Sequence, residues 1–280
     1  MSFVQAQGCR IYHERHGQGP ALVFCHGAGS NAATWWQQIP FFSSHFTCLT
    51  LDCRGFGRSL ARPDSLTWDA LTRDLLAVLD AERIDRAALV CQSLSGGVGL
   101  RLALAHPDRV WALVSSGSPL GIDAPEVLAC VERYLGTSDS RQVEQRALAP
   151  AFRASEAALA FLYQQINAFN PLVSGDLTAE LKRRLQALNH PDALIGCERL
   201  AEVACPVLLV SGEHDPLVPP ELARSIAALF PNARAIEMNA CGHSPYFERP
   251  AEFNAQVGRF LRSCLGGAPA DPVAETGACS

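Results

Sequence analysis

Three residue types that cooperate in nucleophilic catalysis occur along the chain in the order Ser93, Asp215 and His243. A serine hydroxyl is a weak nucleophile until a base within hydrogen-bond reach takes its proton, and histidine is the side chain that titrates nearest neutrality. A carboxylate on the other ring nitrogen fixes the tautomer and stabilises the imidazolium. Ser93, Asp215 and His243 are therefore candidates for a nucleophile, an acid and a base that act together.

The segment 90–97, which reads Val-Cys-Gln-Ser-Leu-Ser-Gly-Gly, lies between an apolar run and a helical pattern. A nucleophile elbow needs this strand–turn–helix setting, with small residues two places before and after the nucleophile. Cys91 and Ser95 meet that requirement for Ser93, although glycine is usual at both places. Spacing alone also allows Ser95 as the nucleophile, but the strand ends at Cys91 and the helix begins at Gly97, which favours Ser93.

Other polar residues near these positions are interpreted as structural. His214 adjoins Asp215, but adjacent residues in a loop usually point apart. After the strand that follows the elbow, the chain reads Ser-Ser-Gly-Ser over 115–118, with no acid before Asp123 that could replace Asp215. Roles in ordering loops and turns or in packing are expected for His26, Asp52, Arg54 and Cys241.

Apolar runs of strand length alternate with helical patterns in residues 1–120 and 201–265. This alternation predicts an α/β core, a mostly parallel sheet with helices on both faces. The expected strands are 21–25, 46–51, 87–91, 110–114, 207–210 and 233–237, with an antiparallel edge strand at 9–16. The expected helices are 68–83, 97–105, 220–230 and 251–265.

Residues 121–200 interrupt the alternation. They contain no strand candidate, only amphipathic helical patterns, at 126–135, 140–148, 156–169 and 177–188. We predict an all-helical cap that packs over the carboxyl edge of the sheet as a lid. The Gly/Pro/Ala-rich tail 266–280 is predicted to be disordered.

The chain resembles the α/β-hydrolase family over nearly all of residues 9–265. Besides the elbow, four segments carry the resemblance: His26-Gly27-Ala28-Gly29, the D-x-R-G-x-G-x-S turn at 52–59, the acid-bearing loop 212–219, and Gly242-His243-Ser244 followed by Glu248-Arg249-Pro250. The resemblance implies the α/β-hydrolase fold and a catalytic triad in the chain order Ser, Asp, His, with Ser93 as the nucleophile, Asp215 as the acid and His243 as the base. It also implies an oxyanion hole made by the backbone N–H groups of Ala28 and Leu94.

Within this family, enzymes that open epoxides or displace halide use an aspartate at the elbow, so Ser93 disfavours both reactions. We expect hydrolysis of an ester, thioester or lactone, or of a carbon–carbon bond in a β-diketone-like compound, with a small, largely apolar substrate. The predicted substrate contacts are Trp35, Phe161 and Phe169. The insertion's arginines are interpreted as solvated helix faces: Arg133, Arg141, Arg146 and Arg153.

Two alternatives from other functional classes stay open. A protein of this fold with an intact triad can act as a small-molecule receptor with slow or no turnover. It can also be a cofactor-free lyase or oxygenase in which His243 serves as a base without an acyl-enzyme.

Composition limits the possible partners. The 280 residues are 48% hydrophobic, carry a net charge of −5 and contain no Lys/Arg cluster, which argues against nucleic acid and anionic membranes. A signal peptide and a membrane span are not expected. The eleven cysteines include no C-x-x-C pair and no zinc-ligand spacing with histidine, so we expect reduced, mostly buried thiols in a cytoplasmic protein without metal or cofactor. The oligomeric state is left open.

Overall fold

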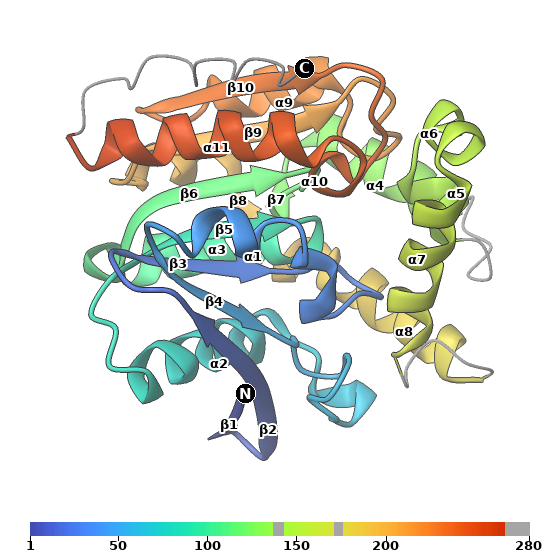
Figure 1. The fold of residues 1–280 in the computed structure, drawn as a ribbon. Coiled ribbons are helices and arrows are strands. Elements are labelled where there is room, and N and C mark those ends of the chain that lie inside the picture. The colour runs from blue at the N-terminus through green and yellow to red at the C-terminus, as the bar shows by residue number, and fades with distance from the viewer. Residues whose placement is uncertain (137–142, 171–175, 267–280) are drawn as a thin grey trace, which may run out of the picture.

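A computed structural model of the protein describes residues 1–136, 143–170 and 176–266. An eight-stranded sheet runs through its centre in the order β1-β2-β4-β3-β5-β6-β9-β10 (Figure 1). The strands are β1 (Ser2–Ala6), β2 (Cys9–His16), β3 (Ala21–Cys25), β4 (Thr47–Leu51), β5 (Ala87–Gln92), β6 (Val110–Ser116), β9 (Val207–Gly212) and β10 (Ala233–Met238). From β4 to β10 neighbouring strands are parallel, and β2 runs antiparallel to both of its neighbours.

Helices cover both faces of the sheet. On one face lie α2 (Trp68–Ala81), α3 (Leu94–Ala105) and α9 (Pro220–Ala227); on the other lie α1 (Ile39–Phe42) and α11 (Pro250–Cys264). Short turns of helix connect these elements: η1 (Ala32–Trp35), η2 (Pro63–Ser65), η3 (Pro107–Arg109), η5 (Pro191–Ala193), η6 (Cys197–Glu202) and α10 (Pro245–Glu248). The predicted fold class is confirmed.

Alternate strand residues supply two hydrophobic cores. In β3, Val23 and Cys25 belong to the core under α2, α3 and α9, whereas Leu22 and Phe24 belong to the core under α1 and α11. Strands buried on both faces need apolar residues at every position, which explains the uninterrupted apolar runs in the sequence. β1 was not predicted, because this edge strand is half exposed and shows no such run.

The segment between β6 and β9 carries five helices: α4 (Pro125–Gly136), α5 (Val143–Ala147), α6 (Pro150–Ser155), α7 (Ala157–Ala168) and α8 (Asp176–Leu188). α5, α6 and α7 stand at the carboxyl ends of the parallel strands (Figure 1). This helical insertion joins both cores, since Val127 and Val131 pack into the α2/α3/α9 core while Tyr163 and Ile166 pack into the α1/α11 core. Its action as a lid stays a prediction.

The prediction that 121–200 holds no strand is wrong. β7 (Ile122–Asp123) and β8 (Ile195–Gly196) pair in parallel where the insertion leaves and rejoins the core. Two residues are too few to produce a recognisable apolar run. The start of the predicted helix 140–148 and nearly all of the predicted disordered tail lie outside the described residues.

In the parts of the chain that the structure describes, no helix is long and apolar enough to cross a bilayer. Within the same residues, no group of three or more His, Cys, Asp or Glu side chains is arranged to hold a metal ion.

Candidate active site

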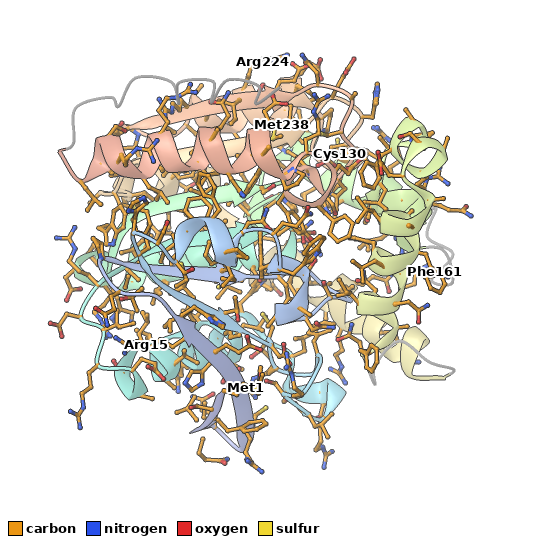
Figure 2. The ribbon with its side chains drawn as sticks, viewed as in Figure 1. Met1, Arg15, Cys130, Phe161, Arg224 and Met238 are labelled. Carbon is orange, nitrogen blue, oxygen red and sulfur yellow. The ribbon has the colours of Figure 1, made fainter. Side chains whose placement is uncertain are left out.

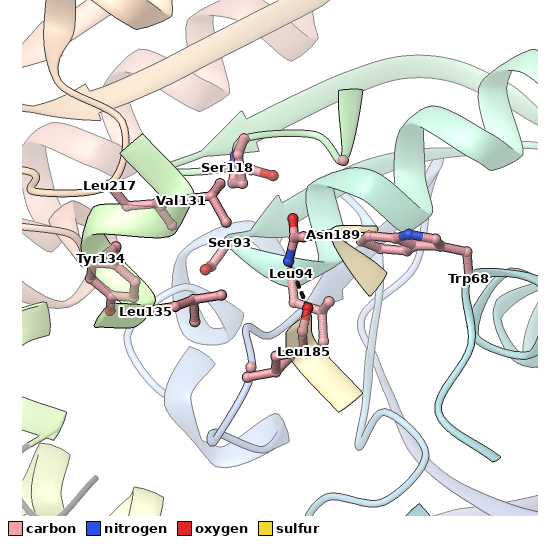
Figure 3. A pocket seen from close by; sticks show the side chains of 13 residues that line it. Trp68, Ser93, Leu94, Ser118, Val131, Tyr134, Leu135, Leu185, Asn189 and Leu217 are labelled. Carbon is pink, nitrogen blue, oxygen red and sulfur yellow. Dashed lines mark hydrogen bonds between the residues drawn. The ribbon is translucent and has the colours of Figure 1, made fainter. Parts of the chain in front are cut away.

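Ser93 stands at the junction between β5 and α3. Its backbone has φ +51° and ψ −116°, a left-handed conformation that costs a residue with a side chain energy and that occurs at nucleophile elbows. The Ser93 N–H donates to the carbonyl of Ser116 at the end of β6, at 2.9 Å. The turn is therefore tied to the neighbouring strand, and the Ser93 side chain lines a pocket (Figure 3).

The two side chains that replace the usual glycines around Ser93 both have partners in the core. Ser95 is buried, and its hydroxyl donates to the carbonyl of His26. Cys91 has no exposed surface and pairs in register with Cys25 on β3. A hydrogen bond with Cys91, together with burial, raises the pKa of the Cys25 thiol well above its usual value. The Ser95 hydroxyl thus anchors the loop after β3, which leaves Ser93 as the serine that opens into the pocket.

Asp215 and His243 meet behind the elbow. His243 Nδ1 lies 3.0 Å from each carboxylate oxygen of Asp215. Asp215 Oδ1 also accepts from the N–H groups of Leu217 at 2.8 Å and Val218 at 3.1 Å, and only 3% of Asp215 and 4% of His243 is exposed. A proton on Nδ1 satisfies this geometry, so Nε2 is left as the acceptor that a general base needs.

The loop after β3 places Ala28 beside Leu94, and both residues line the same pocket as Ser93. Among the described residues, neither backbone N–H has a protein acceptor. His26 shapes this loop: its Nδ1 donates to the carbonyl of Gly27 at 2.7 Å, and its Nε2 accepts from the N–H of Cys53 at 2.9 Å. Burial lowers the pKa of His26, in keeping with the neutral ring that these two bonds require.

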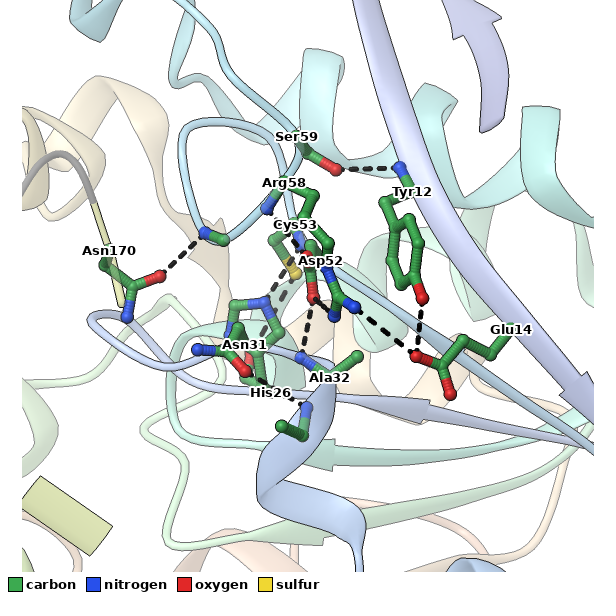
Figure 4. Close-up of polar contacts among 12 residues, drawn as sticks. Tyr12, Glu14, His26, Asn31, Ala32, Asp52, Cys53, Arg58, Ser59 and Asn170 are labelled. Atoms are coloured by element: carbon green, nitrogen blue, oxygen red, sulfur yellow. Dashed lines mark hydrogen bonds and ion pairs between the residues drawn. The ribbon is translucent and has the colours of Figure 1, made fainter. Parts of the chain in front are cut away.

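The turn 52–59 packs against the loop after β3 and is joined to it by hydrogen bonds (Figure 4). Asp52 accepts from the N–H groups of Ala32 and Arg58, each at 2.7 Å, and from the Arg58 guanidinium at 2.7 Å. As the sequence indicated, Asp52 ties down a turn. A fully buried carboxylate with this many donors holds both segments firmly.

Two asparagines connect this support to the insertion. Asn170 donates to the carbonyl of Gly29 at 2.8 Å and accepts from the N–H of Gly57 at 2.7 Å. Asn31 donates to the carbonyl of Ile166 on α7 at 2.7 Å. The helical insertion is thereby fixed against the loop that presents Ala28.

The pocket beside Ser93 encloses about 80 Å³. Its walls come from the core and from α4 and α8 of the insertion (Figure 3). They comprise Ala28, Trp68, Ser93, Leu94, Ser118, Pro119, Gly121, Val131, Tyr134, Leu135, Leu185, Asn189 and Leu217. No Asp, Glu, Lys or Arg occurs among these wall residues, so the pocket suits an uncharged, mostly apolar group.

Comparison with known proteins decides the family. Residues 20–250 match the model of the α/β hydrolase fold. The chain belongs to the α/β-hydrolase family.

The chain is an enzyme of this family, since the curated relatives that it matches are named as an esterase and a hydrolase. A pimeloyl-[acyl-carrier protein] methyl ester esterase of Aeromonas hydrophila is 31% identical over 260 residues, covering 89% of this chain and 98% of that protein. RutD of Caulobacter sp. (strain K31), which is named for carbamate hydrolysis, is 31% identical over 263 residues, covering 90% and 95%. The solved structure of Est816, described as an N-acyl homoserine lactone degrading enzyme, superposes with a TM-score of 0.78 at 26% identity, covering 92% of this chain and 100% of that one.

The three aromatic residues that were predicted to contact substrate do not line this α/β-hydrolase's pocket. Trp35 has no exposed surface, because its ring packs against Phe24 and Tyr246 at centroid distances of 5.3 and 4.5 Å. Phe161 is 61% exposed and Phe169 is 78% exposed. Figure 2 shows Phe161 on α7. Phe161 lies on the side of α7 opposite to the buried Tyr163, since two residues turn a helix by about 200°. The prediction of these contacts is corrected.

Sequence reasoning missed Gly117, whose backbone lies directly against the side chains of Asp215 and His243. Gly117 has φ +56°, and a Cβ there would lie 2.8 Å from Asp215 Oδ2 and 2.9 Å from His243 Nδ1. Both the conformation and the close approach require glycine. A glycine directly after an apolar strand could have indicated this close approach. In the sequence, residues 115–118 served only to show that no acid there could replace Asp215.

Glu248 was also missed as a structural link. Its Oε1 accepts from the N–H of Gly242, and its Oε2 accepts from the N–H of Ala149, each at 2.8 Å. Burial raises the pKa of Glu248 to about 7, although these backbone donors lower it in part. One buried carboxyl therefore joins the loop of His243 to the insertion.

Proposed function

We propose that this hydrolase cleaves carboxylic esters, lactones included, that carry a small apolar acyl group, through an acyl-enzyme on Ser93. One observation carries the proposal: the strained Ser93 opens into an uncharged pocket, next to a buried Asp215–His243 pair with both Nδ1–O distances at 3.0 Å. The names of the esterase and lactone-degrading relatives support the same reaction class.

In this mechanism the Ser93 hydroxyl attacks the ester carbonyl while His243 Nε2 takes its proton. Asp215 keeps the proton of His243 on Nδ1 and stabilises the imidazolium. The negative charge on the former carbonyl oxygen falls to the N–H groups of Ala28 and Leu94, and losing one such donor typically costs about 3 kcal/mol. His243 then protonates the leaving alcohol, and a water molecule repeats the sequence to release the acid and free Ser93.

The size of the pocket supports the acyl-group assignment. An apolar cavity of about 150 Å³ holds a benzene molecule, and this pocket is about 80 Å³. A short alkyl chain fits such a space, whereas a charged group would be desolvated there without a partner.

The test compares Ser93→Ala with Ser95→Ala on p-nitrophenyl acetate. Ser93→Ala should lower kcat about 10³-fold or more, because no acyl-enzyme can form. Ser95→Ala should retain far more activity, since it removes only buried hydrogen bonds to the His26 carbonyl and the Cys53 thiol. Tandem mass spectrometry after treatment with a fluorophosphonate should place the adduct on Ser93 and not on Ser95.

The opposite results would identify another function. An active Ser93→Ala protein, or folded wild-type protein that forms no adduct, would contradict the proposal. Tight ligand binding by Ser93→Ala combined with negligible wild-type turnover would favour the receptor.

A further inference from the structure

A second, larger cavity adjoins the pocket at Tyr134, which is a wall residue of both. This outer cavity encloses about 620 Å³. Its other walls come from the segment 145–151 of the insertion and from residues 214 and 216, on either side of Asp215. Tyr134 also packs against His243, with ring centroids 5.7 Å apart. The boundary between the two cavities therefore lies at the proposed catalytic histidine.

The two cavities differ in charge. The inner pocket has no charged wall residue, whereas the outer cavity is lined by Arg146 and His214 and by no acidic residue. The Arg146 guanidinium carbon lies 5.3 Å from the centre of the Tyr134 ring. Arg146 Nε is buried and has no hydrogen-bond partner within the described part of the chain. Leaving a buried donor unsatisfied costs free energy that an anionic ligand would recover.

Two carboxyl groups near the outer cavity, those of Glu248 and Glu213, accept hydrogen bonds from backbone N–H groups. The carboxyl of Glu248 lies behind Ala149 and accepts backbone N–H groups. Glu213 is 3.9 Å from His214 Nε2 and accepts from the N–H of Ala240 at 2.8 Å, and it is not a wall residue. Among the side chains that the structure describes, no carboxylate pairs with Arg146 and none is a wall residue of the cavity.

The chemistry assigns each half of an ester to one cavity. His243 must deliver a proton to the leaving oxygen, so the alcohol half lies on the histidine side of the scissile bond. The outer cavity is on that side: Tyr134 packs on the His243 ring, and a Cβ on Gly242 would come within 2.8 Å of the Ala149 nitrogen in the cavity wall. The acyl half then occupies the inner pocket beside Ala28 and Leu94.

We propose that the outer cavity binds the alcohol half of the substrate and that Arg146 pairs there with an anionic group, a carboxylate or a phosphate. This inference rests on the proposed ester hydrolysis and specifies its substrate: a small apolar acyl group on a larger, anionic alcohol. The sequence analysis interpreted Arg146 as part of a solvated helix face. On this proposal it is instead a specificity residue.

The test uses two aryl acetates that differ in one charge, 4-acetoxybenzoate and the neutral 4-acetoxybenzamide. The measured quantity is kcat/KM for the anionic ester divided by kcat/KM for the neutral one. Arg146→Gln should lower this ratio about tenfold, the size expected for a charge-assisted hydrogen bond. Arg146→Lys should retain part of the ratio, because an ammonium keeps the charge but loses the planar fork.

Arg259→Gln is the matched control. Arg259 is an exposed residue of α11 that contacts Gln256 at 3.4 Å, so this variant removes the same charge outside both cavities. It should keep the wild-type ratio. Comparing variants with wild type cancels the different intrinsic reactivities of the two esters.

Three outcomes would overturn the inference. One is a ratio that changes less than about twofold in Arg146→Gln, well short of the tenfold loss of a charged pair. Another is an equal change in Arg259→Gln. The third concerns esters that carry the anion on the acyl half. It is an Arg146-dependent preference for monomethyl terephthalate over methyl 4-carbamoylbenzoate, with no such preference between the two aryl acetates. Failure of the proposed function would look different, because the neutral ester would then show no Ser93-dependent hydrolysis.

Discussion

The proposed catalytic groups and the walls of the acyl pocket are built in different ways. Ser93, Asp215 and His243 follow strands β5, β9 and β10, and hydrogen bonds to nearby backbone groups hold Ser93 and Asp215, which in turn holds His243. The pocket walls opposite them come from α4 and α8, which are far apart in the sequence. The catalytic side thus follows from local rules, whereas the substrate side follows from how the insertion settles on the sheet.

Glu248 connects the two sides, and its titration gives the largest expected effect. Its pKa of about 7 lies above the ordinary 4.5, so the fold favours the neutral carboxyl. The stability that this group contributes is complete below about pH 4.5 and is lost as pH rises to about 7, by about 3 kcal/mol. Glu248→Gln should remove this part of the pH dependence. Urea unfolding at about pH 5 and about pH 7.5 measures it.

The absolute stability of Glu248→Gln should be lower at both pH values, because an amide offers one acceptor oxygen where two N–H groups converge. Glu252→Gln is the control: Glu252 is more exposed and pairs with Arg249 at 3.1 Å, so its loss should leave the wild-type pH dependence intact. A Glu248→Gln protein that loses as much stability as wild type over this pH range would contradict the assignment.

Gly117→Ala tests the precision of the catalytic side. The new methyl group would force Asp215 and His243 apart and would add the strain of a positive φ,. We expect kcat to fall about a hundredfold on p-nitrophenyl acetate, because a misplacement near 1 Å costs about that factor. The control is Gly136→Ala, since nothing lies within 4 Å of a Cβ at Gly136. Activity within a few-fold of wild type in Gly117→Ala would mean that the pair tolerates displacement.

Val131→Phe tests the pocket side and has the smallest expected effect. The larger ring would fill the space beside Ser93 that a longer acyl chain needs. Two methylene groups are worth about 0.8 kcal/mol each on burial, so kcat/KM for p-nitrophenyl butyrate relative to the acetate should fall about tenfold. The exposed Phe161 provides the comparison, and Phe161→Ala should keep the wild-type ratio. If Phe161→Ala changes the ratio and Val131→Phe does not, Phe161 contacts the substrate as the sequence analysis predicted.

The fold class and the positions of the parallel strands could be predicted from the sequence, because strands buried on both faces and elbow turns have local sequence signatures. Such signatures were absent at Tyr134 and Glu248. Tyr134 is one aromatic residue in an amphipathic helix, and the partners of Glu248 include Ala149, nearly a hundred residues away in the chain. The predicted substrate contact of Trp35 was wrong for the same reason. Its position a few residues after Ala28 does not reveal that the ring packs into the core.

The shared cores of the insertion limit how the enzyme can move. Val127 and Val131 are held in one core, and Tyr163 and Ile166 in the other. A rigid outward swing of the whole insertion would hydrate apolar surface on both faces of the sheet at once, at about 25 cal/mol for each Å². Rotation of a single ring such as Tyr134 exposes far less and belongs to a much faster class of motion. By this argument, a ring rotation that opens a path between the two cavities costs less free energy than an outward swing of the whole insertion.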